Sequence, residues 1–383
     1  MHVAAFVLGI LLVVATWGGV IAVFVVPRGR SLFQRLPSRL IFTVYRLFVW
    51  GSHLFRRFRD KDGLLAAAGA IALVVQLLSF LTAFMFGYAL ALIPWAHSFS
   101  LAIRESAAAL FIVGIADFTR HTNEYLIVFA AISGAVSIAI QIGYLPVIYQ
   151  SFSRRESLVT MMEARAGVPA WGPEVLIRAE LVGTRDALPD LYKEWELWSA
   201  DVAESHSTYP VLNLFRSPRP GFSWLLSLLA VMDACALHLA LAPSQAPSEA
   251  RLCLRMGFTA LRRIAKTLGW PFQIDPKPDD PIDLSFDDFA QAVEQLRDVG
   301  FPIEREASDA WPHFHGWRVN YEALGYRFAD FLVTPHAPWS GTRKDLQASL
   351  APPERPPHRE PTGEAHSDSR FRPRTDGTPT PTS

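Results

Sequence analysis

Long runs without charged residues dominate the first part of the chain. Residues 3–26, 64–94 and 125–149 form three such runs. Each is long enough to cross a lipid bilayer as a helix, which takes about 20 apolar residues. This pattern predicts an integral membrane protein with three transmembrane helices.

A shorter apolar run, residues 101–112, lies between the second and third of these runs. A helix of about 12 residues reaches only about halfway through a bilayer. The letters VGIAD at 113–117 follow it and interrupt the helical pattern. Non-helical backbone at membrane depth is tolerated where it is buried in protein or lines a water-filled cavity. We therefore predict a re-entrant pore helix and loop over residues 101–118.

Cations collect in the stretch 28–62, which follows the first predicted span. They are Arg28, Arg30, Arg35, Arg39, Arg46, Arg56, Arg57, Arg59 and Lys61. An excess of arginine in a short loop marks the cytoplasmic side of a membrane. The loop 96–124 holds only two arginines and is expected outside. We expect a multi-pass protein of the plasma (inner) membrane, with its N-terminus outside and its C-terminus in the cytoplasm.

Apolar residues recur near helical spacing within the stretch 28–62, with the arginines between them. One interpretation is a helix that lies in the inner membrane interface against anionic headgroups. The other is an ordinary amphipathic helix packed on the rest of the protein. In both cases the stretch is expected to form a basic, amphipathic cytoplasmic linker.

A fourth apolar run, residues 224–242, could pass for another span by length. However, Asp233 and His238 would then lie inside the bilayer, where an acidic residue costs about 2.5 to 3.5 kcal/mol. A fourth crossing would also place the five cations between 251 and 266 outside, against the charge rule. We therefore expect a buried core helix of a cytoplasmic domain here.

The predicted fold class is an all-α membrane protein. Its expected parts are an N-terminal transmembrane helix (1–27), the basic linker (28–62), a pore-like domain (63–153), a cytoplasmic helical domain (154–345) and a disordered C-terminal tail (346–383). Within the pore-like domain we expect an outer helix over 64–94, the pore helix and loop over 101–118, and an inner helix over 125–149. Ser285 is expected to cap a helix that ends at Asp298, and another helix is expected over 318–331.

The overall charge and the cysteines exclude several functions. Lysine plus arginine and aspartate plus glutamate both number 36, so no nucleic-acid partner is indicated. Cys235 and Cys253 are the only cysteines, which argues against a disulfide scaffold. His313 and His315 lack a third ligand at useful spacing for zinc. No nucleophile elbow, phosphate loop or dinucleotide-binding glycine pattern is present, so we expect neither an enzyme nor a cofactor.

Residues 110–117, with the sequence LFIVGIAD, resemble the pore signature of potassium channels, T-T-V-G-Y-G-D. Val113, Gly114 and Asp117 match that signature in register. The resemblance covers about residues 64–150, as span, half-helix, glycine loop and span in the order that this family uses. The ion pathway that it implies consists of Ile112, Val113, Gly114, Ile115, Ala116 and Asp117.

The implied filter differs from the family pattern at three positions. Ile112 stands where the family has a threonine hydroxyl for the innermost ion site, and Ile115 replaces the tyrosine that ties the filter to the surrounding helices. Ala116 replaces the second glycine, and alanine is strained at positive φ. Asp117 keeps a carboxylate at the outer mouth, where four copies would concentrate cations. The alternative for Asp117 is a capping residue of an outer loop.

Two residues of the predicted inner helix are candidates for gating. Gly134 could be a hinge and Pro146 a kink near the cytoplasmic end. Both residue types are also common in membrane helices without such a role. Gln141 either faces a cavity or bonds to a neighbouring helix.

By resemblance, the expected function is passive transport of a monovalent cation, either K⁺ or a non-selective set, across a lipid bilayer. An unidentified signal would gate it through the cytoplasmic domain. One pore loop per chain implies a homotetramer. Two alternatives remain: a non-conducting membrane sensor or scaffold that retains the pore fold, and a four-span transporter subunit with an extracellular C-terminus.

Overall fold

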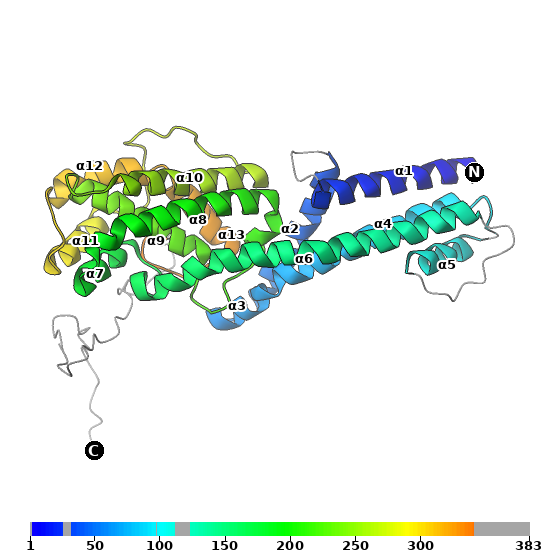
Figure 1. Ribbon diagram of the computed structural model, residues 1–383, viewed down its shortest axis with the longest axis horizontal. Coiled ribbons are helices and arrows are strands. Elements are labelled where there is room, and N and C mark those ends of the chain that lie inside the picture. Colours follow the sequence, from blue (N-terminus) through cyan, green and yellow to red (C-terminus); the bar gives the residue numbers. More distant parts are fainter. Residues whose placement is uncertain (1, 26–31, 97, 112–122, 341–383) are drawn as a thin grey trace, which may run out of the picture.

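The computed structural model describes residues 2–25, 32–96, 98–111 and 123–340, and within these ranges the chain forms helices and no strands (Figure 1). The predicted tail, 346–383, lies outside the described residues. The all-helical part of the predicted fold class is therefore confirmed for the described chain.

The first part of the chain forms an elongated bundle. Its helices are α1 (His2–Val20), which continues as a π-helical turn (Ile21–Val25), α2 (Leu32–Ser52), α3 (Phe58–Ala66), α4 (Ala68–Leu92), α5 (Phe99–Leu110) and α6 (Glu124–Ala166). We call α1, α4, α5 and the first half of α6 the apolar bundle. Figure 1 shows it at one end of the molecule, with α6 running on toward the other end.

The second part of the chain forms a compact group of helices that we call the helical body. Its helices are α7 (Gly172–Val182), α8 (Leu188–Thr208), α9 (Trp224–Leu241), α10 (Ser248–Leu268), α11 (Phe286–Asp298), α12 (Ala307–Arg318) and α13 (Glu322–Leu332), with short 3-10 turns at Arg185–Ala187 and Pro210–Leu214.

Four helical stretches of the described chain are long and apolar enough to cross a membrane. They are His2–Phe24, Phe58–Leu92, Glu124–Ala166 and Trp224–Leu241. The first three bury between 28% and 44% of their most apolar window inside the protein, whereas the fourth buries 94%. The first three therefore direct apolar side chains outward, and the fourth directs them into the protein.

The fourth stretch, α9, is the centre of the helical body. All of its residues are buried, and α7, α8, α10 and α12 pack around it. Its polar residues have partners: Asp233 accepts hydrogen bonds from Arg318 (2.5 Å) and Tyr321 (2.6 Å), and His238 pairs with Tyr192 (3.1 Å). The burial expected for residues 224–242 is confirmed, because the body supplies the partners that a bilayer would lack.

Two local predictions in the helical body can be compared with the structure. The predicted cap is present, since the Ser285 hydroxyl accepts a hydrogen bond from the Asp288 backbone N–H at the start of α11. The helix expected over 318–331 is present as α13, which begins later, at Glu322, and ends at Leu332, whereas Arg318 is the last residue of α12. The break between them allows Arg318 and Tyr321 to reach the same carboxylate on α9.

The predicted outer and inner helices differ from the observed ones in extent. The outer helix expected over 64–94 is divided, with α3 ending at Ala66 and α4 running from Ala68 to Leu92. The inner helix expected over 125–149 is much longer, because α6 continues without a break to Ala166 and ends at Gly167, whose φ is 76°. No helix boundary therefore separates the predicted domains 63–153 and 154–345.

Helix α1 packs closely along α4. A side chain at Gly9 would lie 2.5 Å from backbone atoms of Gly87 and Ala91. Small residues that let two backbones approach are typical of helix pairs in membranes. The apolar bundle is thus held by backbone contact as well as by side-chain packing.

Candidate functional site

The short helix α5 is the feature of the apolar bundle that could form a pore. It has 12 residues and starts at a cap in which the Ser98 hydroxyl accepts a hydrogen bond from the Leu101 backbone N–H. It packs against both α4 and α6. Figure 1 shows it lying beside these two helices at the far end of the bundle.

The contacts of α5 fix how far it runs along its neighbours. Near its start, Ala102 packs against Ala89 and Leu92 at the C-terminal end of α4. One turn further, the Ser106 hydroxyl donates to the Met85 carbonyl oxygen at 2.8 Å. Helix α5 therefore descends alongside α4, away from the end of that helix.

The last residue of α5 meets the middle of the apolar part of α6. A Cβ placed on Gly134 would lie 2.1 Å from the carbonyl oxygen of Leu110. Glycine is therefore required at this point of α6 by close approach. Gly134 lies ten residues after the start of α6 at Glu124, which is about 15 Å along an α-helix.

The chain between the end of α5 and the start of α6 joins two positions that the structure describes, Leu110 and Asn123. Leu110 lies beside Gly134, whereas Asn123 caps the N-terminus of α6 through a hydrogen bond from the Leu126 backbone N–H. The predicted filter residues, Ile112, Val113, Gly114, Ile115, Ala116 and Asp117, lie between them and outside the described residues. The structure describes the residues at both ends of this segment and not the segment itself.

The two hinge candidates lie within continuous helix. Helix α6 runs through both Gly134 and Pro146. The contact with Leu110 explains the glycine by packing, and the gating roles of both residues stay predictions. Gln141 is buried in the described protein and faces its interior.

A polar contact that sequence reasoning missed joins three helices of the bundle. The Trp17 Nε1–H of α1 donates to the Ser133 hydroxyl of α6 at 3.1 Å, and the Tyr88 hydroxyl of α4 lies 2.8 Å from the same oxygen. Ser133, Ser137 and Gln141 follow each other at four-residue spacing and are all buried. That spacing was the available signal, because it places the three polar residues on one face of a helix.

Glu105 is a second residue that the sequence did not single out. It lies on α5 and is 1% exposed. An acidic residue enclosed among apolar helices is uncommon and costly. It adds a carboxyl group to the half-helix, beside the Ser106 that bonds to α4.

Beyond the bundle, α6 carries a buried arginine that holds the helical body. Arg155 donates to the carbonyl oxygens of Leu212 (3.0 Å) and Phe215 (2.7 Å) and pairs with Glu156. Its guanidinium also lies 3.0 Å from His206. Burial and the nearby Arg155 charge hold the pKa of His206 well below its ordinary value of 6.5, so His206 is neutral.

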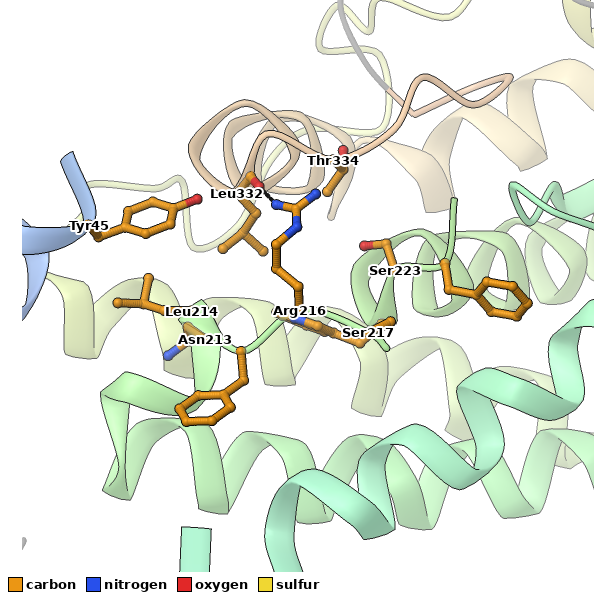
Figure 2. Close-up of a pocket in the computed structure, with 11 residues that line it drawn as sticks. Tyr45, Asn213, Leu214, Arg216, Ser217, Ser223, Leu332 and Thr334 are labelled. Carbon is orange, nitrogen blue, oxygen red and sulfur yellow. Dashed lines mark hydrogen bonds between the residues drawn. The ribbon is translucent and has the colours of Figure 1, made fainter. Parts of the chain in front are cut away.

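Arg216 lies in the same segment as Leu212 and Phe215, which Arg155 contacts, and it connects this segment to α3. Figure 2 shows this side chain in a small cleft that Tyr45 of α2 and Leu332 at the end of α13 also line. Arg216 pairs with Asp62 of α3 at 2.5 Å and donates to the carbonyl oxygens of Leu332 and Val333. It therefore connects α3, which leads into α4, with the helical body.

A second contact in the same cleft joins α2 to α13. The Tyr45 hydroxyl donates to the Phe331 carbonyl oxygen at 3.0 Å, and the two rings lie 5.3 Å apart. The described part of the predicted basic linker, residues 32–62, thus contacts the helical body at Tyr45 and the Arg216 segment at Asp62. Its Arg46, Arg56 and Arg57 point away from the protein surface that it covers.

Metal sites and known relatives give no further assignment. The described residues contain no cluster of histidine, cysteine, aspartate and glutamate that could hold a metal ion. Cys235 and Cys253 are buried free thiols. No protein-family model, curated protein or solved structure matches the chain.

Proposed function

We propose that the chain is the pore-forming subunit of a passive cation channel of the potassium-channel-like class. The observation that carries the proposal is the position of α5. Its C-terminal residue, Leu110, lies beside Gly134, about 15 Å along α6 from the start of that helix. Since the hydrocarbon core of a bilayer is about 30 Å thick, α5 ends near its middle.

The direction of α5 suits a cation. The C-terminal end of a helix carries about half a negative charge from its unpaired carbonyl groups. A half-helix that ends at mid-membrane therefore places negative potential where a permeating cation has lost its hydration shell. The chain has returned to the start of α6 by Asn123, which matches the descent and return of a re-entrant loop.

The proposal includes three membrane crossings, by α1, α4 and α6. These helices expose apolar side chains such as Val14, Val74 and Ile132. The proposal does not count α9 as a fourth span, because all of its residues are buried and other helices of the body pack around it. The proposal includes an N-terminus outside and a helical body in the cytoplasm of a plasma membrane, which the arginine excess in the stretch 28–62 supports.

The ion pathway would be completed by four chains. A central filter requires four equivalent strands, and each chain offers a single candidate segment, residues 112–117. Asp117 would form a ring of four carboxylates at the outer mouth. Because Ile112 and Ala116 depart from the family pattern, we expect weak selectivity between K⁺ and Na⁺.

Gating would act through the contacts that join α6 to the base of α4. Arg155 of α6 holds the segment that contains Leu212 and Phe215, and Arg216 of that segment pairs with Asp62 next to α4. A movement of the helical body is thereby passed to both helices that flank α5.

The half-helix can be tested by labelling from outside. Single cysteines at 107 to 116, in the protein with Cys235 and Cys253 replaced by serine, would be exposed to a membrane-impermeant thiol reagent. We expect labelling after residue 111 and none at Ile132→Cys, which faces outward from α6. Absence of labelling throughout 107 to 116 would overturn the re-entrant arrangement.

Conduction can be tested with purified protein in a planar bilayer under opposing K⁺ and Na⁺ gradients. We expect a cation current with a reversal potential near zero, and a shift toward the K⁺ potential in the double variant Ile112→Thr, Ala116→Gly. Zero current in both proteins, in a verified tetramer, would replace the channel with the non-conducting sensor or scaffold.

A further inference from the structure

An open cleft lies at the far end of α6, in a part of the molecule that the proposed pore does not use. Its volume of about 280 Å³ lies close to the lower limit for small-molecule sites. Helix α7 and the first turn of α8 supply most of its wall. The apolar residues of this wall are Val175, Ala179, Val182, Ala187, Leu188 and Leu191.

The charged residues of the cleft are two arginines, and no carboxylate lines it. Arg178 is already engaged, because it pairs with Glu174 and donates to the carbonyl oxygens of Glu163 and Ala164. Arg165 is half-buried and forms no ion pair among the described residues. The cleft thus offers one cation to a ligand.

Two acidic residues next to the lining, Glu163 and Glu180, have other partners, whereas Asp186 is exposed to solvent. Glu163 pairs with Arg219 at 2.9 Å, and Glu180 pairs with Arg185 at 3.3 Å. The C-terminal carbonyl groups of α6 would otherwise repel an anion, but Arg178 neutralises two of them. Among the lining residues, Arg165 is therefore the cation that no carboxylate neutralises.

We propose that this cleft binds a small amphipathic anion. Its carboxylate would pair with Arg165, and its apolar chain would lie along the wall formed by α7 and α8. An arginine pairs well with a carboxylate because its planar donors match the two oxygens. An apolar pocket with a single fixed charge is the usual form of a site that orients such a ligand.

The position of the cleft distinguishes its ligand from the lipids of the bilayer. Arg165 follows Tyr149, the last residue of the expected inner helix, by about 24 Å along α6. Figure 1 shows the end of α6 beside α7, at the opposite end of the molecule from α5. The ligand is therefore a soluble anion. For its effect on the pore, the inference rests on the proposed function, because the ligand would fix the end of α6 against α7 and α8.

Binding can be measured on the full chain in lipid nanodiscs by isothermal titration calorimetry. The probe is hexanoate, with hexan-1-ol and hexylammonium as uncharged and oppositely charged analogues, and the heat from empty nanodiscs is subtracted. We expect saturable binding of hexanoate that is at least tenfold tighter than that of either analogue. Equal binding of hexanoate and hexan-1-ol would overturn the proposal.

Variants locate the site. Arg165→Gln should weaken hexanoate binding at least tenfold, and Arg165→Lys should keep most of it. Val182→Asp, at a position 59% exposed on the rim, should also weaken it by placing a negative charge there. The control is Arg154→Gln, on the same helix but paired with Asp201 and remote from the cleft.

The binding measurements on the variants test the anion site in the cleft, and the current recordings test the proposed channel. Unchanged affinity in both Arg165→Gln and Val182→Asp would overturn the site. Because calorimetry does not depend on conduction, zero current with intact binding would count against the proposed channel and leave the cleft in place. A change of open probability with hexanoate that Arg165→Gln abolishes would support both.

Discussion

The apolar bundle and the helical body bury opposite kinds of surface. In the bundle, α6 buries Ser133 and Gln141 and exposes Val128 and Ile132. In the body, α9 buries a nearly continuous apolar surface, and the exposed faces around it carry charge, as at Arg255 of α10. Two helices with similar hydropathy are therefore suited to different surroundings, lipid for α6 and protein for α9.

An apolar run therefore indicates that a helix is shielded from water. It does not indicate whether lipid or protein surrounds the helix. In α9 the two polar residues were the sign of a protein environment, because Asp233 and His238 require partners that lipid cannot supply. In the first half of α6 the buried polar residues Ser133, Ser137 and Gln141 lie on one face, at four-residue spacing. The placement of polar residues separates the two cases better than mean hydropathy does.

The largest effect is expected from the buried charge of the helical body. Arg318→Ala would leave Asp233 and Glu322 buried without their cation. We expect a loss of about 3 to 5 kcal/mol in the free energy of unfolding. Denaturant unfolding in mixed micelles, followed by tryptophan fluorescence, would measure it. The control is Arg327→Ala, whose side chain lies on the surface against Trp270; a similar loss in both variants would show that α9 needs no internal charge pair.

The close contact of the bundle should give the next effect. Gly134→Ala places a methyl group against the Leu110 carbonyl oxygen, so α5 must shift. We expect a loss of about 1 to 3 kcal/mol, as for other overpacked sites. Gly143→Ala is the matched control on the same helix, because nothing lies within 4 Å of its Cβ. If the two variants unfold alike in the same assay, the placement of α5 against α6 is wrong.

The stability of the protein should depend on pH through His206, which contacts Arg155 where α6 meets the helical body. His206 is neutral in the folded protein because its pKa lies well below 6.5, whereas an unfolded chain takes up its proton near 6.5. Its contribution to stability is therefore complete above about pH 7 and falls as the pH drops below 6.5. We expect a loss of about 1.4 kcal/mol between pH 7.5 and 5.5. His206→Gln should remove that part of the pH dependence, and an unchanged profile would contradict the assignment.

The smallest effect is expected from the polar contact inside the bundle. Ser133→Ala removes the partner that Trp17 and Tyr88 share. Hydrogen bonds between membrane helices contribute about 0.6 kcal/mol on average, so we expect a loss of about 1 kcal/mol for the two contacts. Ser153→Ala, an exposed position of α6, is the control. A neutral result for Ser133→Ala would mean that backbone packing alone joins the three helices.

The sequence allowed the helical class, the burial of α9 and the cap at Ser285 to be predicted, because each depends on local pattern. The partners of Asp233 could not be predicted, since Arg318 and Tyr321 lie 85 and 88 residues away along the chain. The predicted inner helix is shorter than α6 because the charge at Arg154 predicts the end of a membrane span, and a helix can continue past that point. The signal for the true end was Gly167.

The candidate pore was predictable in outline and not in its contacts. The half-helix at 101–112 is close to the observed α5, because a short apolar run between two spans carries that information. Its contact with Gly134 and the arginine contacts near Asp62 depend on tertiary packing and have no local pattern. The filter residues 112–117 stay a prediction from resemblance.

Because α6 is one continuous helix, a change of its tilt at one point displaces its distant end. Its 43 residues extend for about 65 Å, of which about 48 Å lie beyond the contact at Gly134. A tilt of about 5° around that contact displaces the distal end by about 4 Å, which is close to the rise of three residues of α-helix. A movement of α6 beside Arg165 would thus accompany a small rotation of the helix at its contact with Leu110.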